Sequence, residues 1–193
     1  NGYDATTFYP QDIPSHTFDI TFIGKYYAHY AECPTLLFAA LKALIEEKSI
    51  NKSHITVHFY TNAMGQKAFA ELAAQYSISE IVQVSSYIPR EHIVPIMHQS
   101  SIMLVLTTSA KLHDTHGIMG TKFYEILGIE KPCLCLTSDE ECLADAIEKT
   151  NAGLAATNVE EVKAFILEKY NEWLQNGFTR QAVINKEQFS RQQ

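Results

Sequence analysis

The chain has 193 residues, a net charge of −7 and a hydrophobic content of 46%. This length suits one domain with a short appendage and is sufficient for a real core. The acidic balance argues against a nucleic-acid-binding protein, because a phosphate backbone requires clustered basic residues. A small anionic ligand is not excluded, since its site is local. No apolar run reaches the roughly 20 residues of a membrane-spanning helix, and no signal peptide is recognisable.

Neither the cysteines nor the histidines predict a metal site. Cys133 and Cys135 are two residues apart in an apolar run, so their side chains should lie on the same side of a strand. Their spacing matches neither a zinc site nor a redox pair, and buried free thiols are the favoured interpretation. His113, Asp114 and His116 lie in a polar segment with no helical period. A loop that lines a sugar pocket is therefore the better interpretation there.

Short apolar runs alternate with amphipathic stretches along the chain. The runs are rich in Val, Ile, Phe and Tyr and are nearly continuous, which is typical of strands covered on both faces. The expected elements in chain order are strand 19–24, helix 34–48, strand 55–60, helix 66–76, strand 81–87, helix 91–99, strand 102–107, helix 121–128, strand 132–136, helix 139–150, strand 153–156 and helix 159–175.

This alternation predicts an α/β fold with a doubly wound, parallel sheet of about six strands flanked by helices. We expect one domain at 1–175 and a helical tail at 176–193. Thr121 is the expected N-cap of its helix and Gly128 the expected C-cap. Ligands of such sheets lie beyond the carboxyl ends of the strands. Candidate residues should therefore follow the strands, at 24–25, 61–62, 87–88, from 107 and from 137.

The first candidate follows the first strand, where Gly24 precedes Lys25. Glycine lets a ligand approach the backbone, and the lysine can neutralise a phosphate. A turn glycine beside a solvated lysine is an equally good interpretation of the pair. The chain contains neither a GxGxxG motif nor a P-loop.

The second candidate is the segment that opens the helix at 121. Gly117 and Gly120 precede Thr121, so free backbone amides and the helix dipole predict an anion site. Lys122 adds positive charge, and Glu125 lies one turn into the helix, where a carboxylate can accept hydrogen bonds from a ribose diol. A purely structural role for Glu125 at the helix start is the alternative.

The third candidate is the turn that follows the third strand. Its residues are Ser85, Ser86, Tyr87, Ile88 and Pro89. The proline indicates an exposed turn whose backbone could contact a base edge, with Tyr87 stacking on or flanking the base. A structural tyrosine at a strand end is at least as good an interpretation.

Four stretches together resemble the C-terminal domain of GT-B glycosyltransferases of the family 4, or group 1, type, which includes bacterial surface-polysaccharide and lipopolysaccharide enzymes. Residues 1–4 resemble the NGxD opening, residues 22–41 the GR…LLxAL start and residues 86–89 the GYVP turn. Residues 117–132 resemble the block G…PxKLYEYLAxGKP, which is the specific match. The resemblance covers most of the chain.

The resemblance implies a Rossmann-like half of a two-domain enzyme that transfers a sugar from a nucleotide diphosphate, of the UDP or GDP type, to an acceptor hydroxyl. It implies no further cofactor. The partners would be the nucleotide sugar and an N-terminal acceptor-binding domain, without which this half should be nearly inactive. A cytoplasmic location follows, with any contact to the inner membrane made through the other domain.

Carried over by position, the resemblance assigns a role to each candidate segment. Lys25, beside Gly24, would contact the pyrophosphate, and the turn at Tyr87 and Ile88 would hold the base. Glu125 matches the second glutamate of the family's E-x7-E motif, which binds the ribose, so Lys25 and Glu125 are the expected catalytic residues. The residues that would face the sugar and phosphates are Asp114, Gly117, Ile118, Met119, Gly120, Thr121 and Lys122.

The sequence departs from the family pattern at several positions. The first glutamate of E-x7-E is replaced by Gly117, with Asp114 as a candidate substitute from the loop, and Gly120 stands where proline is common. No second basic residue follows Lys25 before Pro34. Two alternatives therefore stay open. One is a sugar-nucleotide 2-epimerase-like domain, and the other is a non-catalytic, flavodoxin-like binding module.

Overall fold

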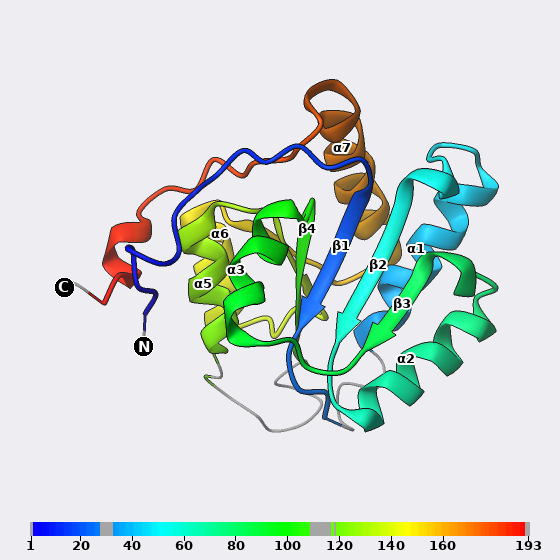
Figure 1. The fold of residues 1–193 in the computed structure, drawn as a ribbon, viewed down its shortest axis with the longest axis horizontal. Helices are drawn as coiled ribbons and strands as arrows, with labels where there is room; N and C mark the ends of the chain where they lie inside the picture. Colours follow the sequence, from blue (N-terminus) through cyan, green and yellow to red (C-terminus); the bar gives the residue numbers. More distant parts are fainter. Residues whose placement is uncertain (1, 28–32, 109–116, 118, 192–193) are drawn as a thin grey trace.

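The computed structural model describes residues 2–27, 33–108, 117 and 119–191, and its central feature is one parallel sheet (Figure 1). The strand order is β3-β2-β1-β4-β5-β6. The strands are β1 (Phe18–Ile23), β2 (Ile55–Tyr60), β3 (Val82–Ser85), β4 (Ile102–Leu106), β5 (Cys133–Leu136) and β6 (Gly153–Ala155). The expected doubly wound sheet is confirmed.

The apolar character of each strand matches its place in the sheet. The inner strands β4 and β5 are buried at every residue, whereas the edge strands β3 and β6 are only half-buried or exposed. β1 pairs in parallel with β2 along its whole length and with β4 through Ile20 and Thr21. A strand buried on both faces needs a continuous apolar run, which is the pattern that the sequence shows.

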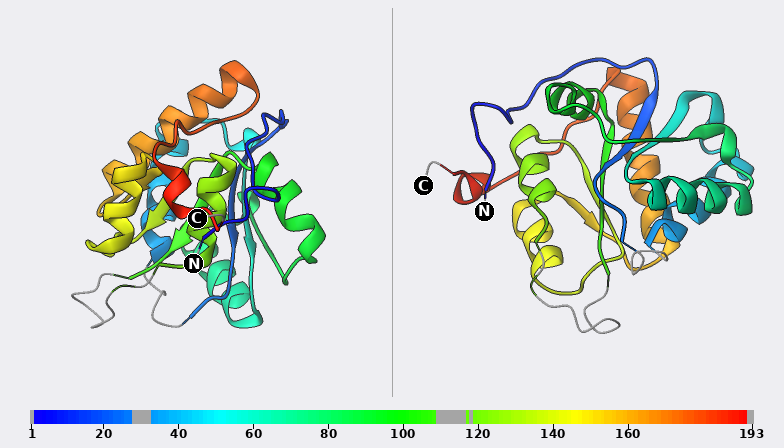
Figure 2. Two further views of the ribbon diagram at one scale, coloured as in Figure 1. Left: turned by 90° about the vertical axis from the view of Figure 1, so that its left-hand side faces the viewer. Right: turned by 60° about the horizontal axis from the view of Figure 1, so that its bottom comes forward.

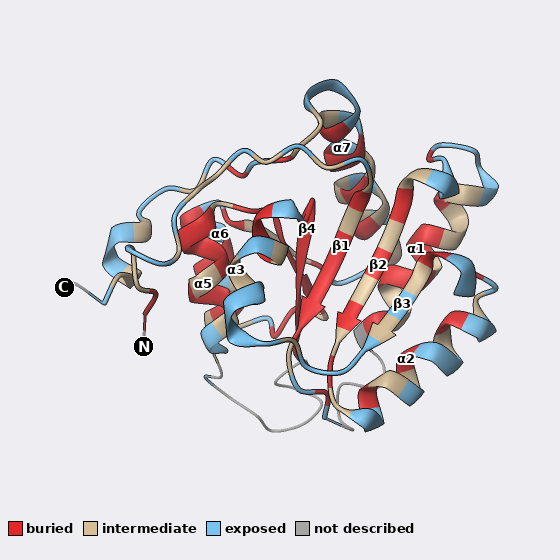
Figure 3. Ribbon diagram, in the orientation of Figure 1, coloured by how far each residue is buried: buried red, intermediate tan, exposed pale blue. Residues whose placement is uncertain are grey.

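Six α-helices in the described part of the chain cover the two faces of the sheet (Figure 2). One hydrophobic cluster joins the sheet to α1 (Cys33–Glu46), α2 (Ala63–Gln75) and α7 (Val159–Asn176). A second joins the opposite face to α3 (Arg90–Gln99), α5 (Thr121–Ile129) and α6 (Cys142–Thr150). Figure 3 shows the buried residues concentrated in the strands and on the helix faces that meet them. No helix within the described ranges is long and apolar enough to cross a membrane.

The two expected caps of α5 are wrong by one and two residues. Gly120 occupies the N-cap position, and Thr121 is the first helical residue. At the other end the C-cap is Glu130, in the left-handed conformation at φ 56°. Gly128 lies inside the helix, where a Cβ would come within 2.7 Å of the Tyr3 ring. This glycine is explained by close packing against the N-terminal segment and not by helix termination.

The expected helical tail is also wrong. Gly177, at φ 77°, ends α7, and after it the described chain contains no helix apart from one 3-10 turn, η4 (Lys186–Phe189). The backbone bonds of the tail go to neighbouring segments: Gln181 N–H donates to Glu130, and Ile184 N–H donates to Thr150. These external acceptors replace the bonds that a helix would make within itself.

The two ends of the described chain pair with each other (Figures 1 and 2). Tyr3 N–H donates to the Phe189 carbonyl at 3.0 Å, and Arg191 N–H donates to the Tyr3 carbonyl at 2.9 Å. The Arg191 side chain also donates to the Gly2 carbonyl at 2.7 Å. The N-terminal segment and the tail therefore form one strip of structure beside α5.

A charged cluster holds this strip against the end of α5. The Glu130 carboxylate accepts bonds from Lys186 at 2.5 Å and from Arg180 at 2.9 Å. Burial opposes the effect, but these bonds lower the pKa of Glu130. The adjacent Lys131 is buried at 2% exposure and donates to the Thr179 carbonyl at 3.2 Å. Desolvation lowers the pKa of Lys131 to about 8, although Asp12 and Glu172 act in the opposite direction.

Lys131 should make stability rise with pH. Below pH 8 its ammonium is charged in both states, and the folded state carries the cost of burying that charge. Between pH 8 and 10.5 the folded state loses its proton first, so the free energy of unfolding should rise, by about 3 kcal/mol in all. Lys131→Met should remove this rise.

Urea unfolding of the wild type and Lys131→Met from pH 7 to 10 measures the effect as the difference between the two curves. The difference is needed because burial raises the pKa of Cys133 to about 12, which lowers stability above pH 9 in both proteins. Lys149→Met is the control, since the Lys149 side chain is 74% exposed. Parallel pH curves for the wild type and Lys131→Met would contradict the prediction.

Candidate functional site

The strand order places a topological switch between β1 and β4. From β1 the sheet continues through β2 to β3 on one side and through β4 to β6 on the other. The loops that leave β1 and β4 lead to opposite halves of the strand order, and ligands of doubly wound sheets bind at such a point, beyond the carboxyl ends of the strands. The described ends of these loops and the start of α5 lie along this edge, at the bottom of Figure 1.

The loop after β1 presents Lys25 to solvent. Gly24 N–H donates to the Tyr60 carbonyl at 3.1 Å, so this glycine continues the pairing of β1 with β2. The next residue, Lys25, is exposed, and its Nζ lies 5.0 Å from the ring centroid of Tyr27. Tyr26 turns inward and is 5% exposed. The arrangement leaves the Lys25 ammonium available at the carboxyl edge of the sheet.

The start of α5 has the geometry of an anion site. Gly120 makes no side-chain capping bond, and a Cβ built at Gly117 or Gly120 would meet nothing within 4 Å among the described residues. The amides of Thr121 and Lys122 therefore have no capping side chain, whereas Phe123 N–H donates to the Gly120 carbonyl at 3.1 Å. Lys122 stands in this first turn. Free amides at a helix N-terminus and an adjacent cation attract a phosphate.

The neighbouring helix α6 shows the opposite arrangement at the same edge. The Asp139 carboxylate is buried and accepts bonds from the amides of Leu143 and Ala144, both at 2.9 Å, and of Glu141 at 3.2 Å. The amides that a ligand would need at α6 are thus already used by a negative side chain. Of these two helices, only α5 presents an N-terminus that suits an anion.

Glu125 stands one turn into α5 and faces a small cavity. Its carboxylate forms an ion pair with Lys122 at 2.5 Å, and each side chain is 23% exposed. The cavity has a volume of about 140 Å³ and is also lined by Arg90 of α3, Asp4 and Arg191. Glu125 is therefore not turned into the hydrophobic core. Arg90, which begins α3 directly after the turn that follows β3, lines the same cavity.

The remaining predicted residues are exposed, packed against a hydrophobic cluster, or outside the described ranges. Tyr87 is 55% exposed, while Ile88 packs against the same hydrophobic cluster as Met119. Met119 also receives a contact of 3.9 Å from the Tyr124 hydroxyl. Thr121 is exposed. The predicted residues Asp114 and Ile118 lie outside the described ranges.

Three residues that line the Glu125 cavity are not predicted by the sequence patterns. Arg90 directly follows Pro89 in the turn already singled out, so its position in sequence is a usable signal. Asp4 is held by its own turn, and hydrogen bonds from Thr6 lower its pKa. Arg191 reaches the cavity only because the chain ends pair, and no sequence pattern indicates that pairing.

In the described ranges, no three His, Cys, Asp or Glu side chains are grouped so that they could hold a metal ion. Cys133 and Cys135 are buried thiols outside any disulfide and lie in the second hydrophobic cluster, as predicted. Burial raises the pKa of the Cys133 thiol to about 12, which keeps it protonated and unreactive at neutral pH.

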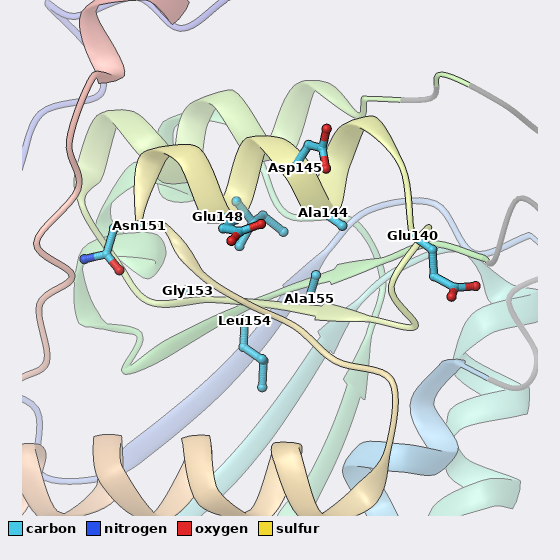
Figure 4. Close-up of a pocket in the computed structure, with 9 residues that line it drawn as sticks. Glu140, Ala144, Asp145, Glu148, Asn151, Gly153, Leu154 and Ala155 are labelled. Atoms are coloured by element: carbon cyan, nitrogen blue, oxygen red, sulfur yellow. The ribbon is translucent and has the colours of Figure 1, made fainter.

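A larger hollow of about 470 Å³ lies between α6 and the edge strand β6 (Figure 4). The side chains of Glu140, Asp145 and Glu148 stand along it, and Asn151 is at its far end. Three carboxylates along one hollow would repel a diphosphate. The hollow is therefore a poor nucleotide site in spite of its size.

The switch point, the start of α5 and the loop lysine mark a candidate anion site at the carboxyl edge of a doubly wound α/β domain. Comparison with solved structures narrows this class of fold: the chain has the fold of one half of a GT-B glycosyltransferase. The C-terminal domain of LpcC, a glycosyl transferase group 1 family protein of Francisella tularensis, is 12% identical at a TM-score of 0.60. The match covers 92% of this chain and 95% of that domain.

Two longer proteins share the same fold over part of their length. HepE of Anabaena, solved with UDP and glucose, is 13% identical at a TM-score of 0.69, over 98% of this chain and 52% of HepE. TarM of S. aureus, solved with UDP among its ligands, is 12% identical at a TM-score of 0.64, over 89% of this chain and 32% of TarM. The chain thus spans about half or less of these two proteins. No protein-family model and no curated protein sequence matches it.

The open N-terminus of α5 makes a prediction about stability. Gly120 has the extended φ of −65° and ψ of 143° that an N-cap residue adopts, and a Cβ there meets no described residue within 4 Å. Both Gly120→Asn and Gly120→Asp should therefore cap α5 and raise the free energy of unfolding, by about 0.5–1 kcal/mol. Chemical denaturation measures the change. Gly128→Ala is the contrasting control and should be destabilising, because its Cβ would contact Tyr3; a loss of stability in both Gly120 variants would contradict the assignment.

Proposed function

We propose that this chain is the donor-binding half of a glycosyltransferase and that it holds the nucleotide diphosphate of a sugar donor at the carboxyl edge of its sheet. The observation that carries the proposal is the open start of α5, with Lys122 and Glu125 in its first two turns. The presence of UDP in the HepE and TarM structures supports UDP as the nucleotide.

The proposed chemistry follows from the charges at this edge. Sugar transfer leaves a nucleoside diphosphate, whose negative charge develops as the bond to the anomeric carbon breaks. The ammonium groups of Lys25 and Lys122 and the amides of α5 would stabilise that charge. The carboxylate of Glu125 would accept hydrogen bonds from the ribose hydroxyls, and the turn at Tyr87 and Ile88 would hold the base.

The carboxylate of Glu125 is engaged by Lys122 at 2.5 Å. A diphosphate at the start of α5 would give Lys122 a second anionic partner, and a ribose would give Glu125 two hydroxyl donors. The ion pair therefore holds both side chains at the edge of the site before the ligand arrives. Such pre-organisation lowers the entropy cost of binding.

The proposal extends to a second domain that binds the acceptor hydroxyl and closes the crevice. Without it, this half should bind nucleotide but turn over little donor. We further propose a cytoplasmic enzyme of bacterial cell-surface polysaccharide or lipopolysaccharide synthesis, on the family resemblance of residues 117–132. The absence of the first glutamate of E-x7-E, at Gly117, leaves the contact to the donor sugar to another group, and Asp114 is our candidate.

UDP should raise the thermal stability of the protein, and Glu125→Ala should weaken its binding. A ligand at a hundredfold its dissociation constant adds about 2.7 kcal/mol of stability.

In Glu125→Ala, removal of hydrogen bonds to a charged acceptor should raise the dissociation constant of UDP by about tenfold to a hundredfold. Calorimetry with UDP, GDP, ADP and CMP and their sugars identifies the base. Glu148→Ala, an exposed glutamate of α6, is the matched control, and equal affinity of Glu125→Ala and wild type would refute the ribose role.

The two substitutions proposed for Gly120 should differ in their effect on UDP binding, although both stabilise the helix. An aspartate at position 120 would bring a negative charge to the proposed place of the diphosphate, whereas an asparagine is neutral. Asp139 already brings such a charge to the start of α6. UDP affinity should therefore fall further in Gly120→Asp than in Gly120→Asn, by about tenfold at low salt. Isothermal titration at two ionic strengths measures the difference. Equal affinities of the two variants would place the diphosphate elsewhere.

A further inference from the structure

The segment Thr61–Asn62 follows β2 at the same edge as the candidate site, but it has no role in the proposal so far. β2 lies between β1 and β3 in the sheet, so this segment stands between the Lys25 loop and the turn at Tyr87. Thr61 is fully buried, and Asn62 is half-buried. Its contacts show what the segment does.

Asn62 occupies the N-cap position of α2, but its side chain makes no capping bond to that helix. An asparagine at this position ordinarily accepts a bond from an amide of the first helical turn. Here the Oδ1 atom accepts instead from the backbone N–H of Tyr26 at 3.1 Å. The Nδ2 atom donates to the carbonyl oxygen of the same residue at 3.3 Å. The amide therefore clamps both polar groups of one residue in the loop after β1.

The clamped residue is also fixed by packing. The Tyr26 ring meets Phe69 of α2 edge-on at 5.1 Å between centroids. Gly65, one turn into α2, leaves no room for a side chain, because a Cβ there would lie 2.6 Å from the Tyr26 Cβ. The side chain of Tyr26 is thus held by α2, and its backbone is held by Asn62. The residue directly before it is Lys25.

Backbone bonds extend this connection across three strand ends. Gly24 N–H donates to the Tyr60 carbonyl at 3.1 Å, and Thr61 N–H donates to the Ser85 carbonyl at 2.9 Å. The sheet pairing therefore continues one step beyond β1 and β2. Asn62 adds the next link with its side chain, through its two bonds to the backbone of Tyr26.

We propose that Asn62 is a positioning residue for nucleotide binding: its side-chain amide clamps Tyr26 and thereby fixes Lys25 where the diphosphate is held. The proposal rests on the proposed function, because Lys25 is the group through which Asn62 acts. It explains why the side chain of an asparagine at a helix N-cap position makes no bond to its helix.

A double-mutant cycle on UDP binding tests the proposal. Lys25→Met should weaken UDP binding by about tenfold, as expected for loss of one charge-assisted bond. Asn62→Ala should weaken it by about fivefold, and the double variant should bind within about twofold of Lys25→Met alone, because the two residues act as one unit. Asn158→Ala is the matched control: it removes the side-chain cap of α7, a bond of 3.0 Å to Glu161 N–H, and should leave UDP binding unchanged.

A second variant protects the test against loss of folding. Asn62→Ser keeps a good N-cap residue for α2, but its side chain is too short to clamp Tyr26. It should be as stable as the wild type and weaken UDP binding like Asn62→Ala. Amide hydrogen exchange of the ligand-free protein should be faster at Tyr26 in both variants and unchanged in Asn158→Ala.

The outcomes separate this inference from the function on which it rests. If the wild type binds no nucleoside diphosphate, the proposed function fails, and exchange at Tyr26 still reports whether the clamp exists. If the wild type binds UDP but Asn62→Ala and Asn62→Ser bind equally well, the positioning role is refuted. Additive losses in the double variant would likewise overturn it, because Asn62 would then act independently of Lys25.

Discussion

The parallel pairing of β1 with both β2 and β4 is the constraint on which the rest of the structure depends. Because β1 is central, the chain must leave it in one direction and return on its other side at β4. Parallel strands place all their carboxyl ends at one edge, so the loops that follow β1, β2 and β3 and the start of α5 meet there. Groups from positions 25, 62 and 125 come to one edge for this reason alone.

At this edge the side chains decide which backbone amides remain available. α5 and α6 both begin there and both carry the partial positive charge of a helix N-terminus. Asp139 neutralises that charge at α6 and takes its amides, whereas Gly120 leaves α5 open. A protein with a net charge of −7 can therefore still present a local anion site. The acidic hollow beside β6 shows that a hollow without suitable charge does not make an anion site.

The fold is predictable from the sequence because the information is local and repeated. Each buried strand has its own apolar run, and the order of these runs along the chain is enough to determine the class of sheet. The ends of elements are less predictable. The sequence pattern indicates a helix stop at Gly128, but this residue is a packing glycine against Tyr3, a contact between residues far apart in sequence. The cavity of Glu125 escapes prediction for the same reason, because the chain ends supply part of its wall.

Glu130 shows how such distant contacts outweigh local preference. A residue in the left-handed conformation costs about 1 kcal/mol unless it is glycine, and a glycine is usual at this point of a helix. The carboxylate of Glu130 offsets that cost with bonds from Arg180 and Lys186 of the tail. A glycine here would relax the backbone but remove two side-chain bonds to the tail, whose end carries Arg191 to the cavity of Glu125. The strained turn after α5 is thus maintained by bonds to the same tail whose end completes the wall of the Glu125 cavity.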